Sequence, residues 1–391
     1  GVYQTFAIDD NGHLYGWGKT GLSSNVYESE ITTQTGESST LLTPHRIVGE
    51  SNSSGQTTIG NLTWNMISSG TSKRANGPYY NNTFAIDNEG NLWGWGINEY
   101  LQIKITGEDI SNLNDESLNL PTYERRVSTP TLIDNEKFGL DSNLDPPEKW
   151  AYVDVGDGFV AAITTRRRLF VWGKNKINEC PIFPYASEIN GNQPILMATS
   201  NDTDDYINEP HEVKLEGNGD GTQWHRVACG DNYILGIAYE NNGKTLWGIG
   251  YDEDNLGQTQ EERDDCSSEH IRLSDKTNWS EVKTNGLSSF AIDSNGNTYA
   301  WGSNLWGNLG ISHNGECNSC NVTTPSNITT TSPGVDTLSI TEPSSVELAY
   351  PGVPPGITKL SCQLEAKLLS KSGLISSRED PPASAFVGQH E

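Results

Sequence analysis

The amino-acid sequence predicts an all-β propeller built from four-stranded antiparallel blades. Three observations lead to this fold class: one segment recurs five times, each copy has the pattern of a β-hairpin, and two further strand-like segments accompany most copies. The copies read TFAIDDNGHLYGWG from Thr5, TFAIDNEGNLWGWG from Thr83, FVAAITTRRRLFVWG from Phe159, ILGIAYENNGKTLWGIG from Ile234 and SFAIDSNGNTYAWG from Ser289. A recurring segment of this kind marks one supersecondary unit per repeat.

Each copy consists of an apolar strand, a polar turn and a second strand in which aromatic and small residues alternate, which is the signature of a hairpin. In three copies the turn begins with Asp and ends with Gly12, Gly90 or Gly296. An aspartate can accept hydrogen bonds from the turn backbone, and glycine adopts the positive φ that the turn needs. Calcium binding is the alternative role for these carboxylates, but the turn already accounts for their spacing, so we expect no metal site.

Two more elements complete the predicted unit. Segments that begin with tryptophan and end near a glycine lie upstream of the hairpins: WNMISSG from Trp64, WAYVDVGDG from Trp150, WHRVACGDN from Trp224 and WSEVKTNG from Trp279. A third element precedes each of these: TPHRIV from Thr43, TPTLI from Thr129, EPHEVKL from Glu209 and SEHIRL from Ser268. Proline in three of them is typical of an edge strand, so we expect four strands per unit, with this element outermost.

A four-stranded sheet cannot bury both of its faces by itself, and radial stacking of the repeated sheets covers them. The recurring tryptophans are therefore predicted to pack between blades: Trp17, Trp95, Trp172 and Trp301. The alternative is that they form platforms on which a ligand stacks.

The linked patterns W-x-x-V-x-x-G, A-I-D-x-x-G-x-L-Y-x-W-G and S-N-x-x-G-x-L-G resemble the regulator of chromosome condensation repeat family. The match is fullest from Trp279 to Gly310, and YDEDNLGQ from Tyr251 keeps part of the last pattern. In the other copies KTGLSSN, INEYLQ and KNKINEC replace that segment. The resemblance implies a propeller, usually of seven blades, whereas five hairpins are visible here.

The resemblance covers residues 1–330, which we expect to form the propeller domain. The first unit begins at Gly1 without its two outer strands, whereas TPSNIT from Thr324 is expected to start one more blade, followed by DTLSI from Asp336. Residues 331–391 are rich in Ser, Thr and Pro, and we expect a tail or linker there, with a closing strand for the ring as a further role.

Charge and hydropathy restrict the partners. Lys and Arg total 25 against 51 Asp and Glu, which gives a net charge of −26. A field of that sign repels phosphate backbones, so we expect no direct contact with nucleic acid. No apolar run approaches the length that spans a bilayer, so no membrane insertion is expected. Gly1 stands where Met or a signal peptide is expected, which points to a cleavage, an engineered start or an incomplete gene end.

No pattern of catalytic or cofactor-binding residues is present. The seven histidines are dispersed, and no phosphate-binding glycine loop or nucleophile elbow occurs. Cys317 and Cys320 form a lone CxxC, for which a metal site, a small disulfide loop and free thiols all remain open. The run Arg166–Arg168 replaces the usual turn of the third hairpin, where it could contact an acidic partner or serve no function. We expect no enzyme activity, no cofactor and no metal.

These features predict a non-catalytic structural or protein-binding propeller, part of a larger assembly and exposed on a particle, an appendage or a cell surface. Long connections of variable length follow each Trp-Gly strand and must emerge on one side of the ring. Tyr and Arg commonly anchor interfaces, so the candidate partner-binding residues in or beside these connections are Tyr100, Tyr123, Arg125, Arg126, Tyr185 and Tyr206. The resemblance implies a second hypothesis, an intracellular regulator that promotes nucleotide exchange on a small GTPase.

Overall fold

The computed structural model describes the strands of all five repeats. The described residues are 4–18, 22, 27–28, 41–49, 59–73, 79–98, 100, 102–103, 126–140, 143–177, 180–181, 186–187, 195–196, 206–215, 221–240, 243–258, 270–305, 307–311, 321–329 and 359–360. Within them the chain forms five four-stranded sheets in which every pairing is antiparallel. The predicted all-β fold of four-stranded blades is therefore confirmed.

Four of the five sheets begin with the tryptophan strand, continue through the hairpin and end with the strand that follows the long connection. The second sheet contains β4 (Trp64–Lys73), β5 (Tyr79–Asp87), β6 (Leu92–Ile97) and β7 (Arg126–Leu132). The third contains β8 (Trp150–Val155), β9 (Phe159–Thr164), β10 (Leu169–Lys174) and β15 (Tyr206–Val213). The fourth contains β16 (Gln223–Cys229), β17 (Tyr233–Glu240), β18 (Gly243–Gly250) and β19 (Ile271–Arg272). The fifth contains β20 (Trp279–Thr284), β21 (Ser288–Asp293), β22 (Thr298–Gly302) and β23 (Val322–Asn327).

The first sheet is completed from the far end of the chain. It contains β1 (Gln4–Ile8), β2 (Leu14–Gly18) and β3 (Leu41–Arg46), and β24 (Lys359–Leu360) pairs with β1 on the other side. The position that the tryptophan strand takes in the other four sheets is thus occupied by two residues from beyond position 330. Asp336, where the sequence analysis expected a strand, lies outside the described residues.

Two expectations about the limits of the units are wrong. The proline-containing strand does not belong with the tryptophan strand that follows it, because β3 pairs with the preceding β2, and β7 with β6. The first sheet consequently lacks one strand of its own repeat instead of two. For the same reason Thr324 does not begin another blade, because β23 pairs with β22 and forms the outer edge of the fifth sheet.

The short elements lie in the connections. They are the 3₁₀ helix η4 (Asn135–Phe138), α1 (Glu253–Leu256), and the small hairpins β11 (Lys176–Ile177) with β12 (Cys180–Pro181) and β13 (Ala186–Ser187) with β14 (Ile195–Leu196). Among the described residues, no helix is long and apolar enough to cross a membrane.

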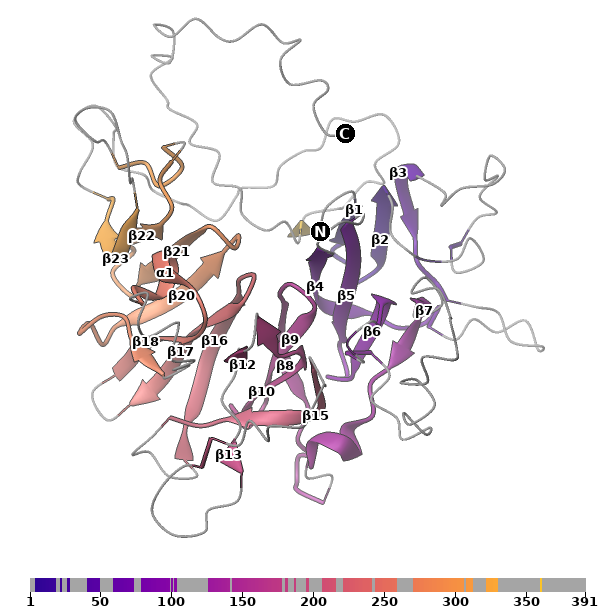
Figure 1. Ribbon diagram of the computed structural model, residues 1–391. Helices are drawn as coiled ribbons and strands as arrows, with labels where there is room; N and C mark the ends of the chain where they lie inside the picture. Colours follow the sequence, from indigo (N-terminus) through magenta and orange to yellow (C-terminus); the bar gives the residue numbers. More distant parts are fainter. Residues whose placement is uncertain are drawn as a thin grey trace, which may run out of the picture.

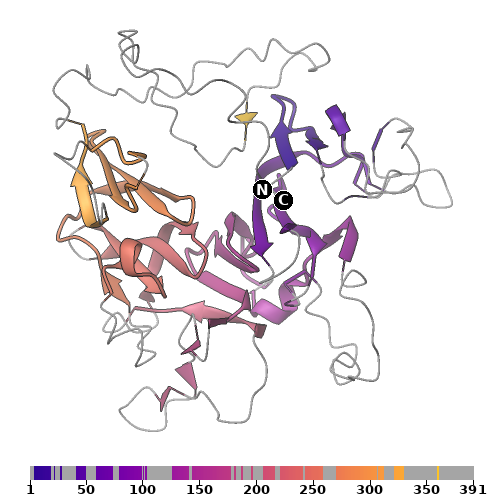
Figure 2. The same cartoon turned by 45° about the horizontal axis from the view of Figure 1, so that its top comes forward.

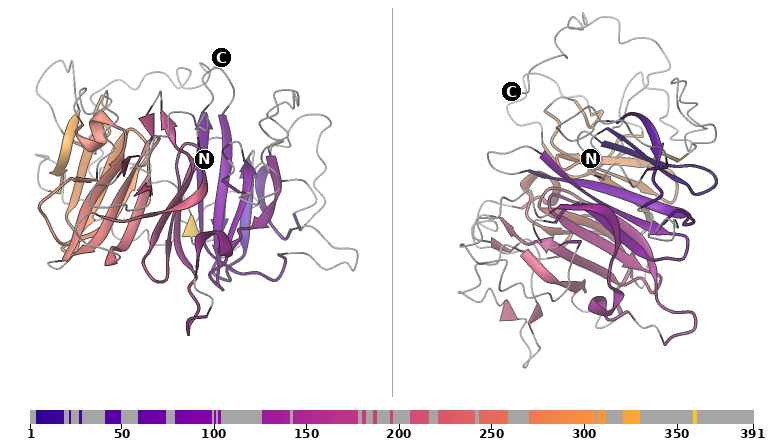
Figure 3. Two further views of the ribbon diagram at one scale, coloured as in Figure 1. Left: turned by 60° about the horizontal axis from the view of Figure 1, so that its bottom comes forward. Right: turned by 90° about the vertical axis from the view of Figure 1, so that its right-hand side faces the viewer.

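The five sheets follow one another along an arc in chain order, with the first and the fifth at its two ends (Figures 1 and 2). Further views show the sheets side by side (Figure 3). Buried apolar residues form three clusters, which lie between the first and second sheets, from the second to the fourth, and between the fourth and fifth. Among the described residues, none of these clusters joins the fifth sheet to the first.

Candidate protein-binding surface

One rim of the propeller is formed where the third strand of every sheet ends. At that place Gly18, Gly96, Gly173, Gly250 and Gly302 all have positive φ, between 80° and 123°. For Gly96 the reason is steric, because a Cβ there would lie 2.3 Å from the carbonyl oxygen of Asn81. Since every sheet has the same strand order, the long connections leave from one side, which we call the loop rim. The opposite side, where the hairpin turns lie, is the turn rim.

The structure places three of the six predicted partner-binding residues. Tyr100 is half-buried and packs closely on Gly158 of the next sheet. A Cβ at Gly158 would lie only 2.7 Å from Cε2 of the Tyr100 ring. Arg126 and Tyr206 each begin the outer strand of a sheet at the loop rim, opposite Ile97 and Lys174, respectively. Tyr123, Arg125 and Tyr185 lie outside the described residues.

Exposed leucines, which the sequence analysis missed, also lie on this rim. Leu287 and Leu305 are 64% and 60% exposed, and the hydrogen bond from Ser303 N to Leu287 O (2.8 Å) holds their two loops together. Leu42, at the loop-rim end of β3, is 89% exposed. Other leucines, such as Leu14, Leu92 and Leu246, are buried, so the exposure of these three could be recognised only from their positions in space.

The second connection retains a loop that the sequence analysis considered lost. Asn98 Oδ1 accepts a hydrogen bond from Ile103 N (2.7 Å), as Asn304 Oδ1 does from Leu309 N (3.0 Å) in the fifth sheet. Ile103 and Leu309 are both buried. The spacing from the asparagine to a buried apolar residue is five in both loops, and this spacing is the signal that could have identified INEYLQ as an equivalent of SNLWGNLG.

A polar cluster joins the innermost strands of four sheets. Asp154 on β8 accepts hydrogen bonds from Ser68 Oγ (2.7 Å) and from Cys229 N (2.8 Å). Tyr152 on the same strand accepts one from Lys283 Nζ of the fifth sheet (2.6 Å). Burial alone would lower the pKa of Lys283, but the Asp154 carboxylate, Tyr152 and Glu281 together raise it above its ordinary value.

Cys229 beside this cluster is a buried thiol, and burial followed by the negative charge of Asp154 raises its pKa well above the ordinary value. A buried, protonated thiol is a poor nucleophile. The described residues contain no group of three or more His, Cys, Asp or Glu side chains that could hold a metal ion. The cluster is therefore chemically suited to tying sheets together, because its charges and donors engage one another.

The sequence matches no protein-family model and no curated protein. Solved structures are nevertheless similar. Prp20p from Saccharomyces cerevisiae superposes with a TM-score of 0.54 at 18% identity, over 82% of this chain and 60% of that one. The same yeast protein, RCC1 (Prp20), bound to Kap60 gives a TM-score of 0.52 at 20% identity, over 83% of this chain and 58% of that one. Human WBSCR16 gives 0.53 at 14% identity, over 86% and 67%.

The fold is an RCC1-like β-propeller. The chain spans about three-fifths of the length of the yeast chains that it matches. Within this RCC1-like propeller, three of the four predicted repeat tryptophans lie between sheets: Trp95, Trp172 and Trp301 are at most 1% exposed. Trp17, on the first sheet at the end of the arc, is half-buried. Trp172, for example, packs in edge-type contacts with Phe84 (6.1 Å between ring centroids) and Phe138 (4.9 Å).

On the turn rim, the aspartates of three hairpin turns are saturated by hydrogen bonds of the turn itself. Asp87 Oδ1 accepts from the backbone N–H groups of Glu89 and Asn91 (both 2.9 Å), and Asp9 and Asp293 do the same in their own turns. Gly12, Gly90 and Gly296 have φ of 79°, 77° and 82°, respectively. This arrangement fulfils the role expected from the turn chemistry.

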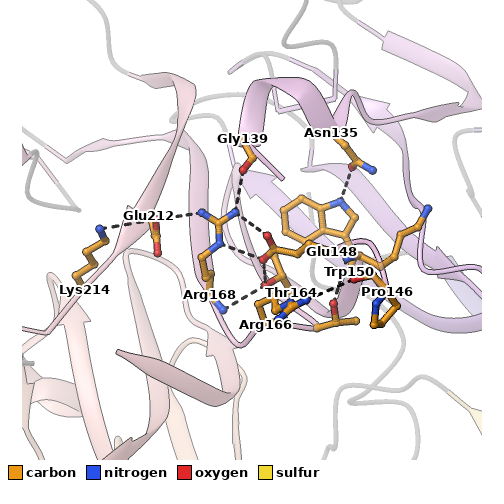
Figure 4. A network of polar contacts seen from close by, with 12 residues as sticks. Asn135, Gly139, Pro146, Glu148, Trp150, Thr164, Arg166, Arg168, Glu212 and Lys214 are labelled. Carbon is orange, nitrogen blue, oxygen red and sulfur yellow. Dashed lines mark hydrogen bonds and ion pairs between the residues drawn. The ribbon is translucent and has the colours of Figure 1, made fainter. Parts of the chain in front are cut away.

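The third hairpin of the RCC1-like propeller achieves the same turn with other residues (Figure 4). Thr164 Oγ1 takes the place of the aspartate, accepting from Arg166 N (3.2 Å) and Arg168 N (3.3 Å). The carboxylate comes from the buried Glu148, which accepts from Thr164 Oγ1 (2.5 Å) and from the Arg168 guanidinium (2.9 and 3.0 Å). Arg168 also contacts Glu212, so this arginine is part of the scaffold and not free to bind a partner.

Proposed function

We propose that this propeller is a non-catalytic protein-binding module whose main protein contact lies on the loop rim. The observation that carries the proposal is the exposure of Leu287 and Leu305, two large apolar side chains on that rim whose loops are joined by a backbone hydrogen bond. Exposed apolar groups near a polar border are typical of protein interfaces. On the same rim, Tyr100 lies between the second and third sheets and supplies an aromatic side chain of the kind that often dominates binding energy.

The similar yeast protein is described by its binding to Gsp1p and histones, and in a second structure it is bound to Kap60. A propeller of this kind can therefore serve as a binding scaffold, which supports the proposal. The net charge of −26 favours a partner with a basic surface. It also suits a molecule that remains soluble while displayed on a particle, an appendage or a cell surface, where we place the chain within a larger assembly.

Site-specific cross-linking tests the proposal. A photoreactive amino acid is introduced at Leu305 on the loop rim and, as a matched control, at Leu132, which is 53% exposed but lies at the turn-rim end of β7. In the native assembly we expect cross-links to one defined protein from position 305 and none from position 132. Cross-links from position 132 alone would overturn the assignment of the loop rim.

Nucleotide exchange on a small GTPase is the second candidate function, favoured by the similarity to the yeast protein described by its binding to Gsp1p. An exchange assay against a panel of GTPases separates the two candidates. An accelerated release of bound nucleotide, lost in the Leu287→Ser/Leu305→Ser double variant, would favour the exchange factor. Unchanged release with the cross-link retained would favour the binding module.

A further inference from the structure

Arg167 occupies a backbone conformation that arginine rarely adopts. Its φ is 65°, and among the described residues it is the one non-glycine residue with positive φ. Glycine occupies the corresponding place in the three turns that end at Gly12, Gly90 and Gly296. A side chain there costs about 1–2 kcal/mol in most contexts, and residues held in such strained conformations cluster at functional sites.

The Arg167 side chain points toward the fourth sheet and away from the acidic network of its neighbour. Its guanidinium carbon lies 4.5 Å from the ring centre of Tyr239 on β17. By contrast, Arg168 is bound by Glu148 and Arg166 donates to Pro146 O, both within the network of Figure 4. The three consecutive arginines therefore have different environments.

A histidine and a lysine follow Tyr239 in a series of contacts. The Tyr239 hydroxyl lies 3.3 Å from His225 Nδ1, and His225 Nε2 lies 3.5 Å from Lys244 Nζ. Arg226, the next residue along β16, donates to the carbonyl oxygen of His225 (3.0 Å). The site therefore combines residues from the third hairpin turn and from three consecutive strands of the fourth sheet.

The positive charge of this cluster is only partly balanced. Arg226 forms an ion pair with Glu281 (3.0 Å), but within the described part of the chain neither Arg167 nor Lys244 has a carboxylate partner. Burial, followed by the charges of Arg226, Lys244 and Arg167, lowers the pKa of His225 to about 4. At neutral pH the imidazole is therefore uncharged, and its two ring nitrogens engage the Tyr239 hydroxyl and the Lys244 ammonium group.

We propose that Arg167 and Lys244, linked through Tyr239 and His225, form a binding site for one small oxyanion, a carboxylate or a phosphate group, on the turn rim. A planar guanidinium and an ammonium group both bind such groups through charge-assisted hydrogen bonds. The net charge of −26 repels extended polyanions, so a single anionic group is the chemistry that fits. This site lies on the rim opposite the proposed protein contact and does not depend on it.

Thermal unfolding in inorganic phosphate and in acetate tests the site, with chloride at the same ionic strength as the reference. The variant Arg167→Gly gives the turn the residue used in the other hairpins, so relief of the left-handed strain offsets the lost contact with Tyr239 and the fold is kept. We expect about 10 mM phosphate or acetate to raise the melting temperature of the wild type by roughly 2 °C over chloride. This difference should disappear in Arg167→Gly and in Lys244→Gln.

Arg46→Gln is the matched control, because Arg46 is paired with Glu28 on the first sheet and its loss also removes one positive charge. It should keep the wild-type response, which separates specific binding from the general effect of salts on stability. The comparison of the two anions shows which oxyanion the site prefers. The proposal is overturned if neither anion exceeds chloride in the wild type, or if Arg167→Gly responds as strongly as the wild type does.

Discussion

The faces between successive sheets and the outward faces at the two ends of the arc contain the same residue types but are buried to different extents. Phe84 of the second sheet is fully buried, with its ring edge-on to Trp172 of the third (6.1 Å between centroids). Phe290 occupies the same place in the fifth sheet and is only half-buried, and Trp17 at the other end is less buried than its three equivalents. The same local sequence thus contributes different stabilisation according to what packs against it.

The largest expected effect is at the tryptophan positions. Trp172→Ala removes a residue that is 1% exposed and whose Nε1 donates to Gln102 O (2.8 Å), so it should lower the free energy of unfolding by about 3–5 kcal/mol. Trp17→Ala should cost about 1–2 kcal/mol, because this side chain is already partly in contact with solvent. Urea unfolding of both variants measures the difference, and equal losses would show that the two faces are equivalent in solution.

The phenylalanines provide a second, smaller contrast. Phe84→Ala leaves a cavity beside Trp172 and should cost about 3 kcal/mol, whereas Phe290→Ala should cost about 1 kcal/mol. Phe6→Ala, next to Trp95 at the interface of the first and second sheets (5.7 Å), is the internal control and should resemble Phe84→Ala. A large loss at Phe290 would mean that another part of the molecule covers the fifth sheet.

The sequence was sufficient to predict strands, turns and the residues that pack between sheets, because these depend on a local pattern repeated five times. It assigned the proline-containing strand to the wrong unit, because a repeating sequence does not show where each unit begins. The proline-containing strand lies between one hairpin and the next tryptophan strand, and the sequence fits either assignment. Only the pairing of β3 with β2 distinguishes them. The site around Arg167 could not be predicted either, because Tyr239 and Lys244 are brought to it by the contact between two sheets.

The contribution of the fifth hairpin turn to stability should depend on pH through the carboxylate of Asp293. Burial alone would raise the pKa of Asp293, but hydrogen bonds from Asn297, Lys276 and Asn295 lower it to about 2. A carboxylate with a depressed pKa stabilises the fold above pH 4, and this contribution, about 1–2 kcal/mol, is lost as the pH falls from 4 toward 2. Unfolding measured across this range should show a weaker pH dependence in Asp293→Asn, and an unchanged dependence would contradict the assignment.

The smallest expected contrast concerns two glycines of the turns. Gly90 and Gly296 have φ of 77° and 82°, so alanine is strained at either position by about 1 kcal/mol. A Cβ at Gly90 would also lie 2.8 Å from Cβ of Lys149 in the next sheet, whereas at Gly296 nothing described lies within 4 Å. Gly90→Ala should therefore destabilise the protein by about 1 kcal/mol more than Gly296→Ala.

Gly139→Ala, with φ of 55° and no described atom within 4 Å of its Cβ, calibrates the cost of backbone strain alone. If Gly296→Ala matches Gly139→Ala and Gly90→Ala exceeds both, the difference measures the contact between sheets; if Gly296→Ala equals Gly90→Ala, a further part of the molecule packs on the fifth turn.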